Sequence, residues 1–334
     1  MKDPRNRTAP RPKAQANSAP RPKAQANSAP RAAPRPQARA NAAPYVFVAP
    51  AVVLFTLLVL VPIGYTLYLS FEKSQVSGLG LGAGARRQVF AGWSNYTSAL
   101  ADPAFDASLL RVLLYSVVLV PVMLGLALLF ALLLDARRVG LQRFARIAIF
   151  LPYAVPIVVA SLLWGFLYLP TVSPFTTILH GLGLSMPDLF ATHAVLFSVA
   201  NVGVWGGTGF NMIVMYTALR AVPSELYEAA RIDGASQRQI ALRVKIPMIA
   251  PALVLTGVFS IIATLQVFNE PVTLAPLTNT ISPVWMPLMK VYDEAFTNNN
   301  IYAAAATSIA IAAGIFVLSY CLLRLSNRHV FEGR

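Results

Sequence analysis

The sequence is poor in the residues that build catalytic and metal sites. Of its 334 residues, one is cysteine and three are histidine. The single cysteine, Cys321, excludes an internal disulfide framework and a Cys-based zinc site, and no HExxH pattern is present to hold a metal ion. No Gly-Lys pair occurs, so the chain has no phosphate-binding P-loop of its own. We therefore expect no catalytic residue, no metal site and no cofactor bound by this chain.

Charge is also scarce, because charged residues make up 12% of the chain and hydrophobic residues 56%. A soluble domain carries about 25% charged residues, and it cannot bury so large an apolar fraction without leaving exposed patches. Six apolar segments each exceed the ~20 residues that a helix needs to cross a hydrocarbon core. The sequence therefore predicts an all-α integral membrane protein with six transmembrane helices, at about 46–70, 112–134, 147–169, 195–218, 248–269 and 301–323.

Residues 1–44 differ in composition from the rest of the chain. They contain nine prolines and no Val, Ile, Leu, Phe, Tyr or Trp, and residues 9–18 repeat unchanged at 19–28. Such a segment cannot bury enough apolar surface to offset the entropy lost on ordering, so we expect a disordered basic tail that lies near anionic lipid headgroups. The tail lacks the aromatic residues on which single-stranded nucleic acids stack, so no nucleic acid is expected as a partner. The predicted domains are this tail, 1–44, and a membrane domain, 45–334.

The distribution of Lys and Arg predicts the orientation in the membrane. With the tail inside, the inner segments carry 22 of these residues and the outer loops carry four. Cytoplasmic loops are the ones enriched in Lys and Arg. Both termini are therefore predicted to be cytoplasmic.

The cytoplasmic loop 223–247 has strong signals for two short helices. Ser224 is expected to cap the first helix, and Glu225 and Glu228 match the positive end of its dipole. Gly234 stands where a left-handed residue would end that helix. Ser236, with Gln at the third position after it, forms the pattern of a capping box for a second helix.

We expect Pro247 to end the second helix. Small side chains lie at the bend between the two helices and would allow another protein to approach closely. A DNA-reading helix-turn-helix has the same outline. However, this loop lies between two spans and has only four basic against three acidic residues, too small an excess for a phosphate track. An amphipathic loop with no partner is the other alternative. A docking surface for a cytoplasmic protein explains more of the residues.

The same loop resembles the EAA loop of binding-protein-dependent ABC importer permeases. That family has Glu-Ala-Ala, three residues, Gly, nine residues and then Ile-x-Leu-Pro. The spacing is kept here, with Val244 and Ile246 at the Ile and Leu positions. Residues 45–334 also resemble the carbohydrate branch of this family, the branch of maltose and oligosaccharide type. The segments that carry this likeness are FAGWSNY (90–96), LPYAVPIVVASLLWGFLY (151–168), FNMIVMYTALRAVPSELYEAARIDGA (210–235) and LQVFNEP (265–271).

The resemblance implies a permease subunit of an ABC sugar importer in a bacterial plasma membrane. It would form half of the translocation path beside a second, homologous permease subunit. A cytoplasmic ABC ATPase dimer would use ATP and Mg²⁺, and an extracellular sugar-binding protein or lipoprotein would deliver the solute. The resemblance assigns coupling to the ATPase to the loop 223–247, through Glu228, Ala229, Ala230, Asp233, Gly234, Ala235 and Pro247.

Polar residues within the predicted spans are candidates for the solute path. A neutral sugar needs hydrogen-bond partners, because burying hydroxyl groups unpaired is costly, and polar groups at membrane depth face a cavity or another helix. Hydrogen bonding between helices is the alternative for each of them. The candidates are Thr264, Gln266, Asn269 and Glu270 at the end of the fifth span, and Asn201, Trp205 and Asn211 in the fourth.

Four glycines also lie in the fourth predicted span, at positions 203, 206, 207 and 209. Close packing against a neighbouring helix is the favoured interpretation. A local break that exposes backbone to the solute path is the alternative.

Two other functions remain open. A permease for another solute, such as a phosphorylated polyol, would need cations facing the path, and Arg111 and Lys290 are the only weak candidates. A self-sufficient secondary transporter would need a charged relay inside the membrane. The six predicted spans hold almost no ionisable group away from their ends. The residues therefore favour a neutral sugar.

Overall fold

The computed structural model describes residues 43–76, 86–136 and 141–330, which are mostly helical. The chain divides into two compact units, Met1–Val53 and Leu54–Arg334. Residues 43–53 are the described part of the first unit and belong to helix α1 (Ala43–Phe55). Almost all of the predicted tail lies outside the described residues. The prediction of an all-α protein needs one correction, because strands β1 (Glu72–Val76) and β2 (Arg86–Phe90) form an antiparallel hairpin.

The predicted first span is helical throughout. Helix α1 is followed directly by a π-helical turn, η1 (Thr56–Leu60), and by α2 (Val61–Ser70). At this turn the Val61 N–H donates to the Thr56 carbonyl, five residues back. Proline cannot donate a helical hydrogen bond, and a π turn directly before Pro62 takes up the resulting irregularity. The hairpin and α3 (Ser94–Leu100) then lead to the second long helix.

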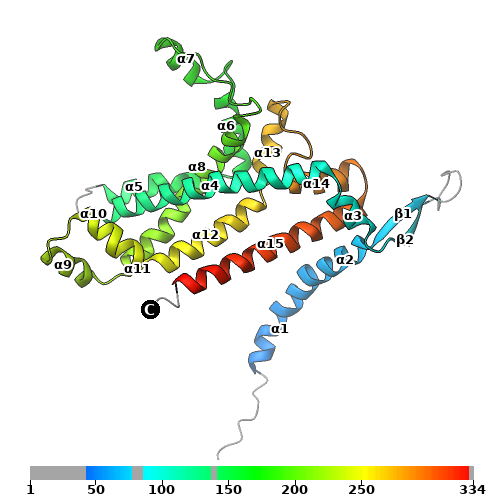
Figure 1. Cartoon of the computed structure of the whole chain (residues 1–334), viewed down its shortest axis with the longest axis horizontal. Helices are drawn as coiled ribbons and strands as arrows, with labels where there is room; N and C mark the ends of the chain where they lie inside the picture. Colours follow the sequence, from blue (N-terminus) through cyan, green and yellow to red (C-terminus); the bar gives the residue numbers. More distant parts are fainter. Residues whose placement is uncertain (1–42, 77–85, 137–140, 331–334) are drawn as a thin grey trace, which may run out of the picture. The chain divides into compact units, whose positions relative to one another are not determined.

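Helices α4 (Pro103–Asp135) and α8 (Val195–Arg220) pack along each other at the centre of the second unit (Figure 1). Helix α4 begins nine residues before the predicted span, because the Asp102 carboxylate accepts a hydrogen bond from the Ala104 N–H at 2.9 Å and Pro103 occupies the first helical position. Helix α12 (Ala250–Leu265) packs against α4, and α15 (Ile301–Val330) packs against α12 and α2.

Three of the four glycines of α8, at positions 203, 207 and 209, confirm the prediction of close packing, whereas a Cβ at Gly206 would have its nearest neighbour at 3.9 Å. The helix is unbroken from Val195 to Arg220, so a local break is ruled out. A Cβ added at Gly209 would overlap the Ile149 carbonyl oxygen and lie 2.8 Å from the Phe150 Cα. At Gly207 it would overlap the Met123 sulfur. Small residues in α8 therefore let neighbouring segments approach its backbone.

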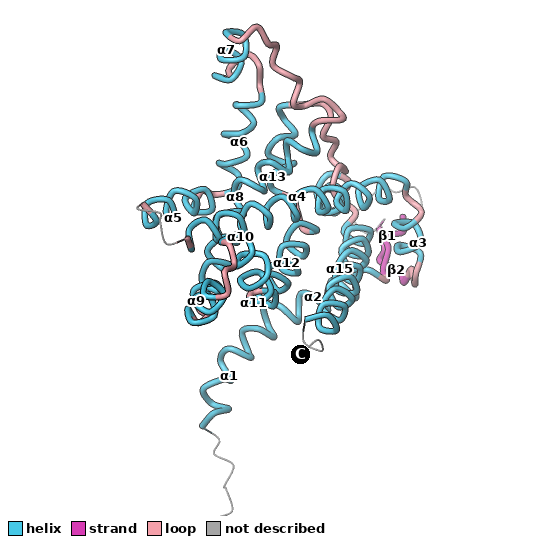
Figure 2. The backbone as a smooth tube through the Cα atoms, turned by 60° about the vertical axis from the view of Figure 1, so that its left-hand side comes forward, coloured by secondary structure: helices cyan, strands magenta, loops and turns pink. Residues whose placement is uncertain are grey.

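The predicted third span is not one continuous helix. It consists of α5 (Gln142–Phe150), the 3₁₀ turn η2 (Leu151–Ala154) and α6 (Ile157–Tyr168), and the chain bends by 96° between Ala154 and Ile157 (Figure 2). Two prolines, Pro152 and Pro156, each lack a backbone donor. Pro156 also keeps Val155 extended, with ψ 127°. Helix α6 leads to α7 (Pro174–Gly181), whose first turn is capped by Ser173.

The predicted fifth span is also preceded by a bend. Helix α9 (Ser224–Ile232) is followed by α10 (Gln237–Ile240), the π turn η3 (Ala241–Lys245) and α11 (Ile246–Met248). The chain then turns by 67° into α12. Pro247 therefore does not end the second loop helix as predicted. A π turn again precedes the proline, and the helix continues through it to Met248.

After α12 the chain forms short segments before its last helix. These are α13 (Asn269–Leu274), η4 (Ala275–Leu277), α14 (Pro287–Tyr292) and the π turn η5 (Asp293–Thr297). Helix α13 packs against α6, and α14 packs against α4 and α15.

Among the described residues, three helices are long and apolar enough to cross a membrane: Tyr45–Ser70, Pro103–Asp135 and Ile301–Arg324. The number rises to five if each bent pair is one span. Helix α8, the predicted fourth span, has 26 residues but is not among them. Its glycines, asparagines and tryptophan lower its hydropathy. The chain is therefore a multi-pass membrane protein, and the prediction of six spans is not confirmed.

Candidate solute cavity and docking loop

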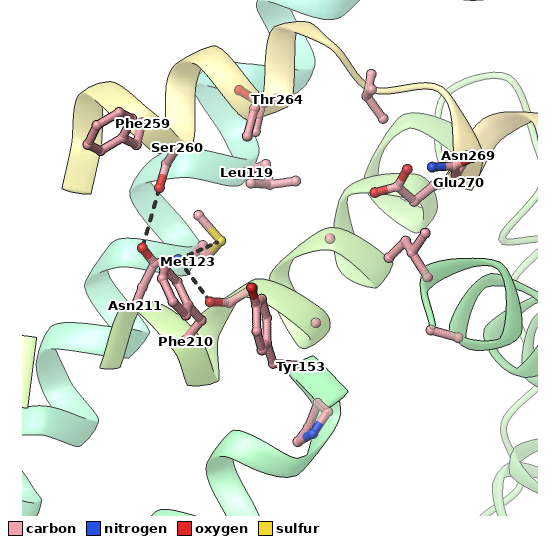
Figure 3. A pocket seen from close by; sticks show the side chains of 18 of the residues that line it. Leu119, Met123, Tyr153, Phe210, Asn211, Phe259, Ser260, Thr264, Asn269 and Glu270 are labelled. Atoms are coloured by element: carbon pink, nitrogen blue, oxygen red, sulfur yellow. Dashed lines mark hydrogen bonds between the residues drawn. The ribbon is translucent and has the colours of Figure 1, made fainter. Parts of the chain in front are cut away.

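A cavity of about 990 Å³ opens beside the central helix pair. Its walls come from α4, from η2 and the start of α6, from α8, from α12 and from α13 (Figure 3). The sharp bend between η2 and α6 brings residues 152–157 to this wall. The volume lies at the upper end of the range that small-molecule sites occupy.

Thr264 lines this cavity, and so do four of the other six candidate path residues. They are Asn211, Gln266, Asn269 and Glu270. Figure 3 shows Asn269 and Glu270 at the start of α13, on the opposite side of the cavity from Asn211. The structure therefore brings together polar groups that come from α8, α12 and α13.

The polar groups of α8 and α12 that face the cavity also hold the helices together. Between α12 and α8, Ser260 Oγ donates to Asn211 Oδ1 at 3.5 Å, while Asn211 Nδ2 donates within α8 to the Gly207 carbonyl at 2.8 Å. Ser116 Oγ of α4 donates to Thr264 Oγ1 at 3.0 Å. Asn211 and Thr264 thus take part in bonds between helices and also border the cavity.

Asn201 and Trp205 are not among the residues that line this cavity. Asn201 Nδ2 donates to the Tyr168 hydroxyl at 2.9 Å, and that hydroxyl donates to the Ser198 carbonyl at 2.9 Å. The Trp205 ring lies edge-to-face with Trp164, with centroids 6.1 Å apart. Both residues contact α6 rather than the cavity.

Aromatic residues of the cavity were not predicted from the sequence. Tyr153 and Phe210 stack with ring centroids 4.9 Å apart, and Phe259 lies on the neighbouring helix α12. The three side chains are 49%, 44% and 62% exposed, although large aromatic residues usually lie inside a folded chain. The pattern Pro-Tyr-Ala-Val-Pro at 152–156 was the available signal, because two prolines mark a break that exposes the residue between them.

Charge is sparse in this cavity. Glu270 is the one ionisable acid among its described lining residues, and none of them is Lys, Arg or His. No ion pair within the described part of the chain includes the Glu270 carboxylate. The cavity therefore offers neutral donors and acceptors, aromatic faces and one carboxylate.

The loop between α8 and α12 folds by local hydrogen bonds. Gly234 has φ +81°, and its N–H donates to the Arg231 carbonyl at 3.0 Å. The Ala235 N–H donates to the Ala230 carbonyl at 2.9 Å, which completes a Schellman motif at the end of α9. The capping box is also present, because Ser236 N–H donates to Gln239 Oε1 at 2.7 Å and Gln239 N–H donates to Ser236 Oγ at 3.3 Å.

Ser224 does not cap α9 as predicted. Pro223 occupies the cap position, and no side chain there accepts a hydrogen bond. Ser224 is instead the first helical residue. Of the seven candidate coupling residues, five are exposed and two, Ala230 and Ala235, are partly buried; the exposed ones are Glu228, Ala229, Asp233, Gly234 and Pro247.

A buried ion pair fixes this loop to the end of α4. Lys245 Nζ pairs with Asp135 Oδ2, and the two side chains are 13% and 7% exposed. Lys245 Nζ also lies 5.0 Å from the centroid of the Tyr227 ring on α9. The Tyr227 hydroxyl donates to the Leu219 carbonyl of α8 at 3.4 Å. The ion pair and its ring contact connect both halves of the loop to the central helix pair.

A second charged cluster holds the opposite end of α4. Lys290 of α14 pairs with Asp102 and with Glu294, the latter at 3.0 Å, and Glu294 accepts a hydrogen bond from Thr307 at 2.8 Å. The Lys290 ammonium and the Ala104 N–H hold the pKa of Asp102 below its ordinary value. Burial lowers the pKa of Lys290, but its two carboxylate partners outweigh this effect and raise the pKa. Lys290 does not line the 990 Å³ cavity, and neither does Arg111.

A helical, multi-pass chain with a solute-sized cavity between its helices has the architecture of a membrane permease. The family described as the binding-protein-dependent transport system inner membrane component matches residues 123–331. The chain belongs to this family, and it is a transport subunit rather than an enzyme.

Named relatives match most of the chain. The chain is 29% identical over 293 residues to the sn-glycerol-3-phosphate transport system permease protein UgpA of Agrobacterium fabrum. This match covers 86% of this chain and 96% of the relative. The UgpA protein of Rhizobium meliloti is 30% identical over 294 residues, covering 86% and 96%. The diacetylchitobiose uptake system permease protein NgcF of Streptomyces coelicolor is 31% identical over 251 residues, covering 72% and 71%.

A solved structure shares the fold. One chain of a bacterial ABC transporter involved in the import of the acidic polysaccharide alginate has a TM-score of 0.73 and 19% sequence identity. The match covers 86% of this chain and 95% of that chain. At this identity the likeness concerns the fold alone.

Proposed function

We propose that this chain is a permease subunit of a bacterial ABC sugar importer and that the 990 Å³ cavity is its half of the solute path. The observation that carries this proposal is the pairing of neutral polar groups with exposed aromatic rings in one cavity. Each sugar hydroxyl needs a hydrogen-bond partner when it leaves water. Apolar and aromatic walls with a few placed polar groups are typical of small-molecule sites.

The solutes named for the relatives support a polyhydroxylated substrate, because they include diacetylchitobiose and sn-glycerol 3-phosphate. Glycerol 3-phosphate is also the best alternative. A phosphate group favours Lys or Arg at its site, whereas the described lining of this cavity holds no cation and includes Glu270. The cavity therefore favours a neutral sugar over a phosphorylated polyol.

Uptake measurements test the choice of solute. In cells that express the whole transport system, we expect uptake of a labelled neutral oligosaccharide and little uptake of sn-glycerol 3-phosphate. Tyr153→Leu and Phe259→Leu should each raise the KM for the sugar, because each removes an aromatic wall of the cavity. Phe316→Leu is the matched control, since Phe316 is 72% exposed on α15 and does not line the cavity. Transport of glycerol phosphate alone, or the same KM in all three variants, would contradict the proposal.

The loop 223–247 is proposed to dock on a cytoplasmic ABC ATPase dimer that uses ATP and Mg²⁺. Most of the candidate coupling residues are exposed. Next to them Ile232, an apolar residue, is 86% exposed, as expected of a surface that another protein covers. Closure of the ATPase pair would move the loop as a rigid body and so switch access to the cavity.

Substitution of Gly234 tests the docking proposal. Gly234→Asp should lower the amount of ATPase that co-purifies and abolish transport. Gly183→Asp is the matched control, because Gly183 also has a positive φ, +73°, and open space around its Cα, but lies between α7 and α8. If Gly234→Asp keeps both the ATPase and transport, the loop is not the docking surface.

The remaining parts of the assembly belong to the same proposal. We infer six spans, with the bent pairs and α8 each crossing once, both termini in the cytoplasm, and the basic tail 1–44 ahead of a permease domain, 45–334. A second permease subunit, a sugar-binding protein or lipoprotein and membrane lipid would complete the complex. Affinity purification in mild detergent should recover a second permease and a P-loop ATPase, and recovery of this chain alone would contradict the assembly.

Cysteine labelling tests the orientation. Cys321 is the only cysteine of the chain, so Cys321→Ser gives a background free of thiols. In that background, Ser94→Cys should react with a membrane-impermeant maleimide in intact cells and Gln237→Cys should not. Both positions are exposed, so a reversed pattern would mean a reversed orientation.

A further inference from the structure

A second cavity, of about 410 Å³, lies where α4 and α8 both begin their charge-free sequences. We propose that it binds the phosphodiester headgroup of an anionic phospholipid. The cavity is lined by Ala107, Leu110, Arg111, Leu114, Thr192, Val195, Leu196, Thr280, Ser282 and Trp285. No acidic residue is among these lining residues, so the cavity carries a net positive charge from Arg111.

Within the described part of the chain, the guanidinium of Arg111 has no counter-ion. It donates to the Trp285 carbonyl and lies 5.3 Å from the centroid of the Trp285 ring. No carboxylate of the described residues forms an ion pair with it. An Arg has five N–H donors, and a half-buried cation is stable only when an anion or polar groups compensate it. The remaining donors are available to an anion in the cavity.

Two further donors lie at the same cavity. The hydroxyl groups of Thr192 and Ser282 are exposed, and neither has a hydrogen-bond partner within the described part of the chain. The third hydroxyl, that of Thr280, donates to the Phe190 carbonyl at 2.6 Å and is therefore occupied. One guanidinium and two free hydroxyls form the donor set that binds a phosphate group.

The depth of the cavity favours a lipid over a soluble anion. Residues 112–134 of α4 contain no charged residue and rise about 35 Å as a helix, slightly more than the ~30 Å hydrocarbon core. Arg111 therefore stands at the headgroup level, and α8 starts its own charge-free run at Val195 beside it. Leu110 and Leu114, on the same helix face, are 60% and 49% exposed and can contact the acyl chains.

The charges favour an anionic lipid over a zwitterionic one. A phosphodiester carries one negative charge, which Arg111 neutralises. The ammonium group of a zwitterionic lipid would need an acceptor such as a carboxylate, and the lining residues include none. The oxygen atoms of Thr192 and Ser282, whose hydrogens point to the phosphate, can in addition accept hydrogen bonds from the hydroxyls of a phosphatidylglycerol headgroup.

Lipid retention tests the proposal. The transporter complex is extracted with mild detergent, incubated with equal amounts of phosphatidylglycerol and phosphatidylethanolamine, washed, and the retained lipids are quantified by mass spectrometry. The wild type should retain more phosphatidylglycerol than Arg111→Gln by about one molecule per chain, and Arg111→Lys should keep most of it. Lys73→Gln is the control for loss of a cation, because Lys73 is exposed on the hairpin.

A second variant keeps the test valid if Arg111→Gln does not fold. Thr192→Val combined with Ser282→Ala retains the cation and removes the two hydroxyls, and it should lower the preference for phosphatidylglycerol over phosphatidylethanolamine. Equal retention by the wild type and both variants would overturn the proposal. Displacement of the bound lipid by an excess of sn-glycerol 3-phosphate or inorganic phosphate would also overturn it, because the ligand would then be a soluble anion.

Discussion

The ion pair between Lys245 and Asp135 gives the sharpest prediction about how the loop 223–247 is held against α4. Lys245→Met removes the ammonium but leaves the Asp135 carboxylate 7% exposed with no cation beside it. Removing one partner of a buried ion pair costs about 3–5 kcal/mol. Loss of the contact with the Tyr227 ring, at 5.0 Å, adds about 0.5–1 kcal/mol. We therefore expect Lys245→Met to destabilise the chain by about 3.5–6 kcal/mol.

The double variant separates the ion pair from packing. Asp135→Asn together with Lys245→Met leaves no charge buried, and the methionine fills much of the lysine volume. Replacement of a whole buried ion pair by groups of similar volume is often close to neutral. The double variant should therefore be more stable than Lys245→Met alone, which is the reverse of additive behaviour.

The assay is the half-life of the folded protein at a fixed temperature in detergent, because large membrane proteins often unfold irreversibly. Lys73→Met serves as the control, since Lys73 is exposed and an exposed substitution changes stability by about 0.5 kcal/mol or less. The reasoning is refuted if Lys245→Met and Lys73→Met have the same half-life. It is also refuted if the double variant is as unstable as the two single changes added together.

Three other predictions concern stability. Gly234→Ala should lower it by about 1–2 kcal/mol, measured by thermal unfolding, because φ +81° strains any residue with a Cβ although the space around it is open. Gly209→Ala should lower the free energy of unfolding by about 1–3 kcal/mol, because its Cβ would overlap the backbone of Ile149. Gly206→Ala is the control and should be tolerated, because its Cβ would have its nearest neighbour at 3.9 Å. Equal effects of the two substitutions would contradict the packing argument. Pairing with Lys290 lowers the pKa of Asp102 below its ordinary value of 3.8. The pairing therefore stabilises the folded chain fully at a pH above 3.8, and this stabilisation is lost as the pH falls through the lowered pKa. Asp102→Asn should therefore flatten the decline of Tm below about pH 4, and an unchanged decline would argue against the pairing.

The loop 223–247 was largely predictable because its structure depends on neighbours in the sequence. The capping box joins residues three apart, and the left-handed Gly234 is required by hydrogen bonds within a few residues of it. The errors in this loop concern Ser224 and Pro247. Which residue becomes the cap, and whether a proline ends a helix or is taken up by a π turn, depends on how the flanking segments continue.

The cavity was predictable only in part. Polar residues inside apolar segments are visible in a sequence, and so Asn211, Gln266 and Glu270 were found. Asn201 looks the same in sequence but bonds to Tyr168 on another helix. Which way a polar side chain of a helix faces depends on the rotation of that helix against its neighbours, and no local pattern records it.

The sequence by itself determined the class of protein, because transfer of a segment into lipid depends on the composition of that segment. It also determined the family, through a loop with fixed spacing, and most helix positions. Only the tertiary structure decided where the chain bends by 96°, that Tyr153 meets Phe210, and that Lys245 pairs with Asp135, 110 residues away. Such contacts join segments that are far apart in the chain. Their partners are selected by packing geometry and by the energy of burying charge, which exist only once the helices have assembled.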